Sequence, residues 1–145
     1  MLIDTADLHK HRGRVSMVDG GFDPLHHGHI EYLEQAAALG LPVLCNLAPD
    51  EWVAAKHPVL LTQAQRARVV DSIRFIDFTH LSHGPTVEVL AELRPRHYVK
   101  GADWEGRLPD AELAACAEHG IDVVYLDAVL DSSSAIVRRM QGGES

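Results

Sequence analysis

The sequence has few cysteines and no long apolar run. Only two of its 145 residues are cysteine, Cys45 and Cys116, and they stand in apolar surroundings without the spacing of a zinc or redox motif. No apolar stretch approaches the roughly 18 residues of a membrane span, and residues 1–7 lack the regions of a secretory signal. These absences predict free buried thiols and a soluble, cytoplasmic protein with no membrane partner.

Basic charge is also scarce. There are 13 Lys and Arg against 21 Asp and Glu, which gives a net charge of -8. Such a field repels phosphate backbones, so we expect no nucleic-acid partner. The content of 46% hydrophobic and 23% charged residues is ordinary for a globular chain and excludes disorder, collagen and coiled coil as whole-chain descriptions.

Short apolar runs alternate with helical patterns from Arg14 onward. The runs predict five strands, at 15–19, 42–47, 75–81, 97–100 and 121–126. The patterns between and after them predict helices at 27–39, 63–74, 84–93 and 110–118 and from the serine cluster at 131–134. Apolar strands that alternate with helices form a parallel sheet covered on both faces. We therefore expect a Rossmann-like, doubly wound, five-stranded α/β domain over residues 14–141, preceded by an N-terminal arm over residues 1–13.

The most informative segment joins the first strand to the first helix and reads Gly20-Gly-Phe-Asp-Pro-Leu-His-His-Gly-His29. Glycine lets a ligand approach the backbone, and a helix N-terminus offers unpaired N–H groups and partial positive charge. His26 and His29 are three residues apart, so both face one side of the opening turn. The segment therefore predicts a phosphate site. Two alternatives stay open, a plain turn with surface histidines and a divalent-metal site formed by Asp23, His26 and His29.

The pattern Gly20-x-Phe22-Asp23-x-x-His26-x-Gly28-His29 resembles the HxGH signature of the nucleotidyltransferase superfamily, which includes the cytidylyltransferases. The resemblance covers nearly the whole chain from Arg14. Segments 50–52 and 71–77 are similar to glycerol-3-phosphate cytidylyltransferase, and segment 99–104 is similar both to that enzyme and to the heptose-1-phosphate adenylyltransferases. Ser132, Ser133 and Ser134 stand where the family has its serine- and threonine-rich helix start.

The resemblance implies transfer of a nucleoside monophosphate from a triphosphate to a small phosphorylated polyol or sugar, with release of pyrophosphate. It implies His26, His29 and Lys56 as catalytic residues, and Mg²⁺, carried mainly by the triphosphate, as cofactor. It also implies a set of nucleotide-binding residues, namely Gly20, Gly21, Phe22, Asp23, Gly28, Arg66, Gly101, Asp103, Trp104, Ser132, Ser133 and Ser134.

The residues leave the nucleotide open. Segment 103–106 is closer to the cytidylyltransferases, whereas segment 99–101 is closer to the adenylyltransferases, and 127–130 lacks an arginine that the cytidylyltransferases carry. CTP with a glycerol-3-phosphate-like acceptor is the first expectation, and ATP with a heptose 1-phosphate is the alternative. A non-catalytic nucleotide sensor is less favoured because the His pair is intact. An RNA-directed enzyme is less favoured because the chain is acidic. Relatives of this size are commonly dimers, so a homodimer is expected.

Overall fold

A five-stranded parallel sheet forms the centre of the molecule. The computed structural model describes residues 1–127 and 133–142. The strands are β1 (Ser16–Gly20), β2 (Val43–Leu47), β3 (Phe78–Leu81), β4 (His97–Gly101) and β5 (Asp122–Leu126). Their order is β3-β2-β1-β4-β5, and every neighbouring pair is parallel. The predicted doubly wound fold is therefore confirmed, and each strand lies within two residues of its predicted limits except β3, which starts at Phe78 instead of 75.

The helices follow the predicted alternation with the strands. They are α1 (His27–Ala37), α2 (Asp50–Ala54), α3 (Gln63–Asp71), α4 (Thr86–Leu93), α5 (Asp110–His119) and α6 (Ser133–Gly142), with 3-10 turns η1 (Thr5–His11) and η2 (Ala102–Trp104). The expected capping box of α3 is confirmed, since Thr62 and Gln65 exchange backbone-to-side-chain hydrogen bonds of 3.0 and 3.3 Å. The short elements α2, η1 and η2 were not predicted.

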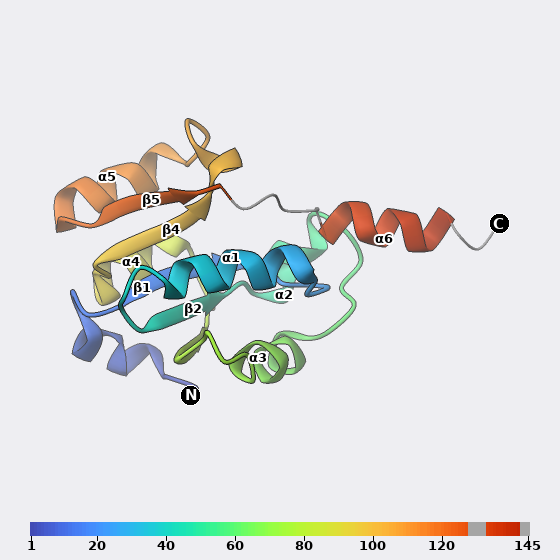
Figure 1. Ribbon diagram of the computed structural model, residues 1–145, viewed down its shortest axis with the longest axis horizontal. Coiled ribbons are helices and arrows are strands. Elements are labelled where there is room, and N and C mark those ends of the chain that lie inside the picture. The colour runs from blue at the N-terminus through green and yellow to red at the C-terminus, as the bar shows by residue number, and fades with distance from the viewer. Residues whose placement is uncertain (128–132, 143–145) are drawn as a thin grey trace.

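The sheet separates two apolar cores. Side chains alternate along each strand, so Met17, Leu44 and Tyr98 pack on the side of α4 and α5. Their neighbours Val18 and Cys45 pack on the other side, which α1 and α3 cover (Figure 1). This alternation continues past the cores to the carboxyl edge of the sheet and directs the last polar residues of β1, β2 and β4 toward α4 and α5.

The N-terminal segment packs against strand β3. The Ile3 N–H donates to the backbone oxygen of Thr79, and the Thr79 N–H donates to the backbone oxygen of Met1, both at 2.9 Å. Leu8 of η1 is fully buried in the core beside α4. The arm therefore covers the edge of the sheet, whose unpaired backbone groups would otherwise face solvent.

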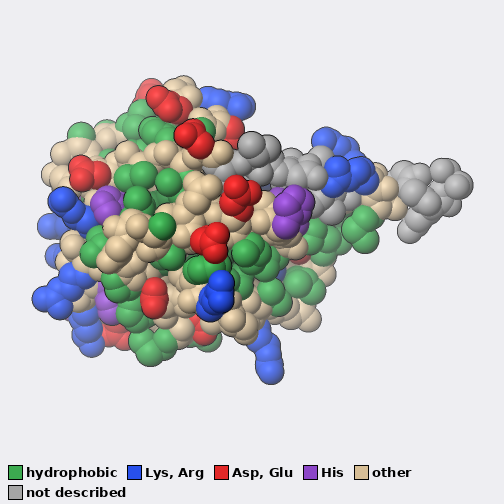
Figure 2. Space-filling model, in the orientation of Figure 1, with side chains coloured by type: hydrophobic (Ala, Val, Ile, Leu, Met, Phe, Trp, Pro, Cys, Tyr) green, Lys and Arg blue, Asp and Glu red, His purple; other side chains and the backbone are tan. Residues whose placement is uncertain are grey.

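The strand order reverses between β1 and β4. In open parallel sheets, ligands bind beyond the carboxyl ends of the strands at this point. Helix α6 extends from the same end of the sheet (Figure 1), with basic side chains exposed along it (Figure 2). Among the described helices, none combines the length and apolar character that a bilayer crossing requires.

Candidate active site

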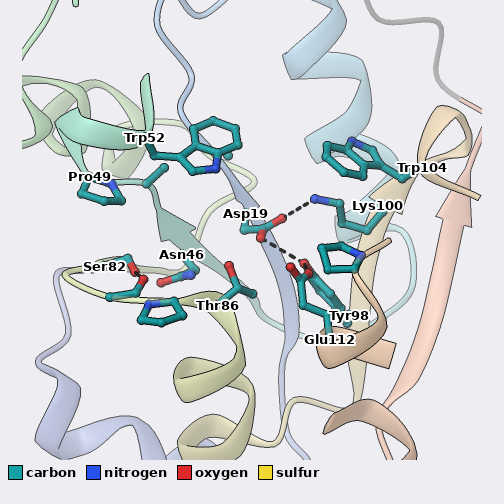
Figure 3. A pocket seen from close by; sticks show the side chains of 15 residues that line it. Asp19, Asn46, Pro49, Trp52, Ser82, Thr86, Tyr98, Lys100, Trp104 and Glu112 are labelled. Atoms are coloured by element: carbon teal, nitrogen blue, oxygen red, sulfur yellow. Dashed lines mark hydrogen bonds and ion pairs between the residues drawn. The ribbon is translucent and has the colours of Figure 1, made fainter. Parts of the chain in front are cut away.

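A cavity of about 330 Å³ lies at the carboxyl ends of β1, β2 and β4. Strand ends form its floor, while α2, η2 and the N-terminal parts of α4 and α5 form its walls (Figure 3). The side chains that give it its chemistry are Asp19, Asn46, Trp52, Tyr98, Lys100, Trp104 and Glu112. The cavity thus occupies the position that the strand order predicts for a ligand.

A buried ion pair and a tyrosine connect the floor of this cavity. Lys100 Nζ lies 2.8 Å from Asp19 Oδ1, and the two side chains are only 10% and 12% exposed. The Tyr98 hydroxyl lies 3.1 Å from Asp19 Oδ2 and 2.6 Å from Glu112 Oε1. Burial and then the charge of Asp19 raise the pKa of Tyr98 well above its usual value, so the phenol keeps its proton. The carboxylates of Asp19 and Glu112 therefore share only the phenolic proton of Tyr98 and the ammonium group of Lys100. Some of their lone pairs remain available to accept hydrogen bonds from a ligand in the cavity.

Two lysines lie over two tryptophans beside the cavity. Lys56 Nζ is 3.7 Å from the centre of the Trp52 ring, and Lys100 Nζ is 4.3 Å from the centre of the Trp104 ring. Partial burial and then the charge of Lys100 lower the pKa of Lys56. Lys56 lies in the turn after α2 and Lys100 lies in β4, and because the charge of Lys100 disfavours the charge of Lys56, an anion beside them would be favoured.

The expected pair His26 and His29 begins α1 on the other side of β1. The Gly28 N–H donates to His26 Nδ1 at 3.1 Å, and the His26 N–H donates to His29 Nδ1 at 3.3 Å. Because both Nδ1 atoms accept, each neutral ring carries its proton on Nε2. Burial and then His26 lower the pKa of His29 to about 3, so its ring is neutral at pH 7. The backbone N–H groups of the turn thus leave Nε2 as the protonated nitrogen of each ring. The centres of the two rings lie 3.9 Å apart.

The other residues of the HxGH loop have structural contacts. Asp23 is 2% exposed, and its carboxylate accepts the Leu60 and Leu61 N–H groups at 2.8 and 3.1 Å. The Phe22 ring is buried and meets the His29 ring edge-on at 4.9 Å. These contacts fix the loop between β1 and α1. The Asp23 carboxylate, one ligand of the alternative metal site, already accepts two backbone protons, and the described residues hold no group of three or more His, Cys, Asp or Glu that could bind a metal ion.

Arg66 was expected to bind the nucleotide, and the structure places its guanidinium beneath the loops instead. The side chain is 0% exposed. It donates to the backbone oxygens of Gly21, Ala48 and Leu61 and to the Asp50 carboxylate, at 2.7 to 3.1 Å. With these partners Arg66 connects three loops at the carboxyl edge, and the contacts that the structure shows for its guanidinium are to the backbone, Gly21 included, and to Asp50.

Several expected nucleotide-binding residues lie near the cavity. Gly101 ends β4, Trp104 lines the cavity from η2, and Asp103 between them is exposed. Ser133 and Ser134 begin α6, and Ser132 lies outside the described residues. Gly20 lines the cavity and Gly28 is buried at the start of α1.

Five side chains that the sequence reasoning missed belong to this site. They are Asp19, Asn46, Tyr98, Lys100 and Glu112, all of which line the cavity. One signal could have found three of them, because Asp19, Asn46 and Lys100 occupy positions of equal direction near the ends of three neighbouring strands. For Glu112, which comes from α5, the sequence carries no comparable signal.

Comparison with known proteins shows the family of the chain. The profile of the family described as cytidylyltransferase-like matches residues 17–139. The bifunctional protein HldE of Gluconobacter oxydans is 34% identical over 143 residues, which cover 94% of this chain and 29% of that protein. HldE of Alkalilimnicola ehrlichii is 33% identical over 150 residues, with 97% of this chain and 30% of that protein covered. The chain therefore spans less than a third of the length of these relatives.

A solved structure shares the fold. The lipopolysaccharide core biosynthesis protein from Thermoplasma volcanium superposes with a TM-score of 0.68 and 24% identity, covering 80% of this chain and 98% of that one. At this level of identity the likeness concerns the arrangement of the sheet and helices.

Proposed function

Because the chain belongs to the cytidylyltransferase-like family, we propose that it transfers a nucleoside monophosphate from a triphosphate to a small phosphorylated polyol or sugar and releases pyrophosphate. One observation carries this proposal. The rings of His26 and His29, whose Nδ1 atoms accept backbone N–H groups, lie at the start of α1 on one side of β1, and a cavity with a buried lysine lies on the other. In this proposal a triphosphate and an acceptor approach each other across Gly20 and Gly21, which have no side chains.

The reaction needs no protein nucleophile. A phosphate oxygen of the acceptor attacks the α-phosphorus, the bond from that phosphorus to its bridging oxygen breaks, and pyrophosphate leaves with the electron pair. The barrier arises from bringing anions together and from charge on the phosphoryl oxygens, so positioned donors and cations lower it. In this proposal His26 and His29 donate to the triphosphate, and Lys56 neutralises charge as the phosphates approach each other.

The acceptor fits the cavity described above by its chemistry. Lys100, with Lys56 nearby, offers positive charge to a phosphate. Asp19 and Glu112 offer carboxylate oxygens, which accept from hydroxyl groups and repel a second anion. A molecule with a phosphate at one end and hydroxyl groups at the other matches both parts.

The donor nucleotide is proposed to be CTP, with ATP as the second candidate. Segment 103–106 favours CTP. Similarity over most of this chain to part of the proteins named HldE agrees with the adenylyltransferase-like segment 99–101 and favours ATP. Mg²⁺ is proposed to bind through the triphosphate oxygens, whose charge it would reduce. Among the described residues, no group of three or more His, Cys, Asp or Glu side chains forms a site for it.

The test is pyrophosphate release in the presence of Mg²⁺. CTP and ATP are presented separately with glycerol 3-phosphate, heptose 1-phosphate, phosphocholine and other phosphorylated polyols. We expect release with one triphosphate and a hydroxyl-rich acceptor, and weak release with phosphocholine. The exposed His27 supplies a control, since His27→Ala should retain activity that His26→Ala loses. Tight triphosphate binding without release for any pair would contradict the proposal and support a nucleotide sensor. Gel filtration with light scattering tests the proposed homodimer.

A further inference from the structure

The charges that line the cavity at the carboxyl edge do not balance. The charged side chains in its lining are Asp19, Lys100 and Glu112. Asp19 and Lys100 form an ion pair of 2.8 Å, so their formal charges cancel. Within residues 1–127 and 133–142, no Lys, Arg or His side chain forms an ion pair with Glu112. The cavity therefore has one uncompensated negative charge, on the wall that α5 forms.

A single hydrogen bond fixes this carboxylate. The Tyr98 hydroxyl lies 2.6 Å from Glu112 Oε1, and because a carboxylate only accepts, the phenol is the donor. The other oxygen of Glu112 has no hydrogen-bond partner among the residues that the structure describes. Glu112 thus has one oxygen that is held by the protein and one that is available to a molecule in the cavity.

The unshared positive charge lies on the opposite side of the cavity. Figure 3 shows Trp52 and Glu112 on opposite sides of Asp19. The ammonium group of Lys56 lies over the Trp52 ring, 3.7 Å from its centre. A phosphate group is attracted to the side of Trp52 and Lys56, so the other end of the same molecule would face Glu112.

We propose that Glu112, positioned by Tyr98, is a specificity-determining residue that limits the acceptor to one phosphate. A hydroxyl group at the end away from the reacting phosphate can donate to the available oxygen of Glu112. A second phosphate at that end would bring like charges together in a partly buried cavity, where water and salt screen the repulsion only weakly. The acceptor class is thereby narrowed to monophosphates with a distal hydroxyl group. This inference rests on the proposed function for the identity of the occupant as the acceptor.

Three probes that differ at one carbon atom test the proposal. Glycerol 3-phosphate has a terminal hydroxyl group, propane-1,2-diol 1-phosphate has a hydrogen atom in its place, and glycerol 1,3-bisphosphate has a second phosphate. Tryptophan fluorescence can measure the Kd of each, because the chain has two tryptophans and both line the cavity. We expect the wild type to bind glycerol 3-phosphate at least about 10-fold more tightly than either of the other two.

The variants separate the charge of Glu112 from its orientation. Glu112→Gln removes the charge with little change in shape, and should tighten binding of the bisphosphate at least about 10-fold relative to glycerol 3-phosphate. Glu112→Asp keeps the charge and should keep rejecting the bisphosphate. Tyr98→Phe also keeps the charge but removes the donor that fixes the carboxylate, so it should lose the preference for the hydroxyl group and retain the rejection.

The matched control is Glu118→Gln. It makes the same change of charge at an exposed position of α5 outside the cavity, and should leave all three Kd values as in the wild type. An unchanged ratio of the bisphosphate Kd to the monophosphate Kd in Glu112→Gln, or an equal change of this ratio in Glu118→Gln, would overturn the inference. A folded wild type that does not bind glycerol 3-phosphate would also overturn it.

These titrations need no triphosphate, so they are independent of turnover. The expected pattern of Kd values without pyrophosphate release from any triphosphate would refute the proposed function and leave the selection of monophosphates in place. Pyrophosphate release from a wild type that binds the bisphosphate as tightly as glycerol 3-phosphate would refute only the role of Glu112.

Discussion

The tautomers of the HxGH pair permit a test that separates catalysis from helix capping. In His29 the two ring nitrogens have different partners, since Nδ1 accepts the His26 N–H and Nε2 carries the proton. Asparagine places its amide oxygen near the position of Nδ1 and has no atom near Nε2. Glutamine reaches the position of Nε2 with an N–H group and leaves Nδ1 unmatched. His29→Asn should therefore retain the cap and lose the outward donor, whereas His29→Gln should do the reverse.

The structure sets the size of both effects. Removing one donor to a charged transition state costs about 2.7–4 kcal/mol, so His29→Asn should lower kcat about 10²- to 10³-fold. The cap hydrogen bond is long, at 3.3 Å. Its loss in His29→Gln should therefore cost about 0.5–1 kcal/mol, at the low end for helix caps, or a decrease of a few degrees in Tm. Both variants lose the edge-on contact between His29 and Phe22, so that contact cancels when they are compared.

The assay is pyrophosphate release at saturating substrates, combined with thermal unfolding followed by circular dichroism. We expect His29→Gln to be at least about 10-fold more active than His29→Asn although it is the less stable protein. The His27→Ala protein serves as the control for changes at an exposed histidine of the same turn. Equal activity of the Asn and Gln variants, with both folded, would refute the assignment of Nε2 as the donor atom.

Three further predictions concern stability. Arg66→Met leaves the carbonyl oxygens it binds without a donor, and should cost at least about 1–3 kcal/mol in urea unfolding, the range for a buried polar group left unsatisfied. A raised triphosphate KM at unchanged stability would instead indicate direct phosphate binding. A Cβ at Gly21 would lie 3.0 Å from Val53 Cγ2, so Gly21→Ala should cost about 1–3 kcal/mol, and Val53→Ala in the same chain should recover part of it. The His29 pKa falls from 6.5 in the unfolded chain to about 3, so the unfolded chain binds more protons in this range. Stability should therefore decrease from pH 6.5 toward pH 3, by up to ~1.4 kcal/mol per pH unit, and His29→Asn should reduce this slope in urea titrations.

The fold could be predicted from the sequence because its local signals agree. Apolar runs of strand length recur between helices whose ends carry a capping box at Thr62 and a left-handed glycine at Gly120. The strand at Phe78 was predicted three residues too early, because Phe75 and Ile76 are apolar like strand residues but belong to a turn that begins at Ile73. Helix α2 has only five residues and no side-chain cap, so neither periodicity nor capping marks it.

The candidate site was harder to predict, because its character depends on contacts between distant segments. Arg66 lies among the polar residues Gln63, Gln65 and Arg68 of α3 and therefore resembles an exposed residue in the sequence, although the structure buries it completely. The pairing of Asp19 with Lys100 joins residues 81 positions apart. Both residues end strands, and only the order of those strands shows that β1 and β4 are neighbours.

The alternation of side chains along the strands also explains why the turn after β1 begins with two glycines. Met17 and Asp19 point toward α4 and α5, where the cavity lies, whereas Phe22 packs toward α1, where His29 lies. The Gly20-Gly21 backbone is therefore the ridge between the proposed triphosphate site and the proposed acceptor site. A side chain on this ridge would separate the attacking oxygen from the α-phosphorus, and a Cβ at Gly21 would also press on α2, which carries Trp52. Arg66, which binds the Gly21 oxygen from below, holds this ridge in place. In the proposed reaction, attack across the ridge would therefore depend on two residues without side chains and on one buried guanidinium that lies beneath them.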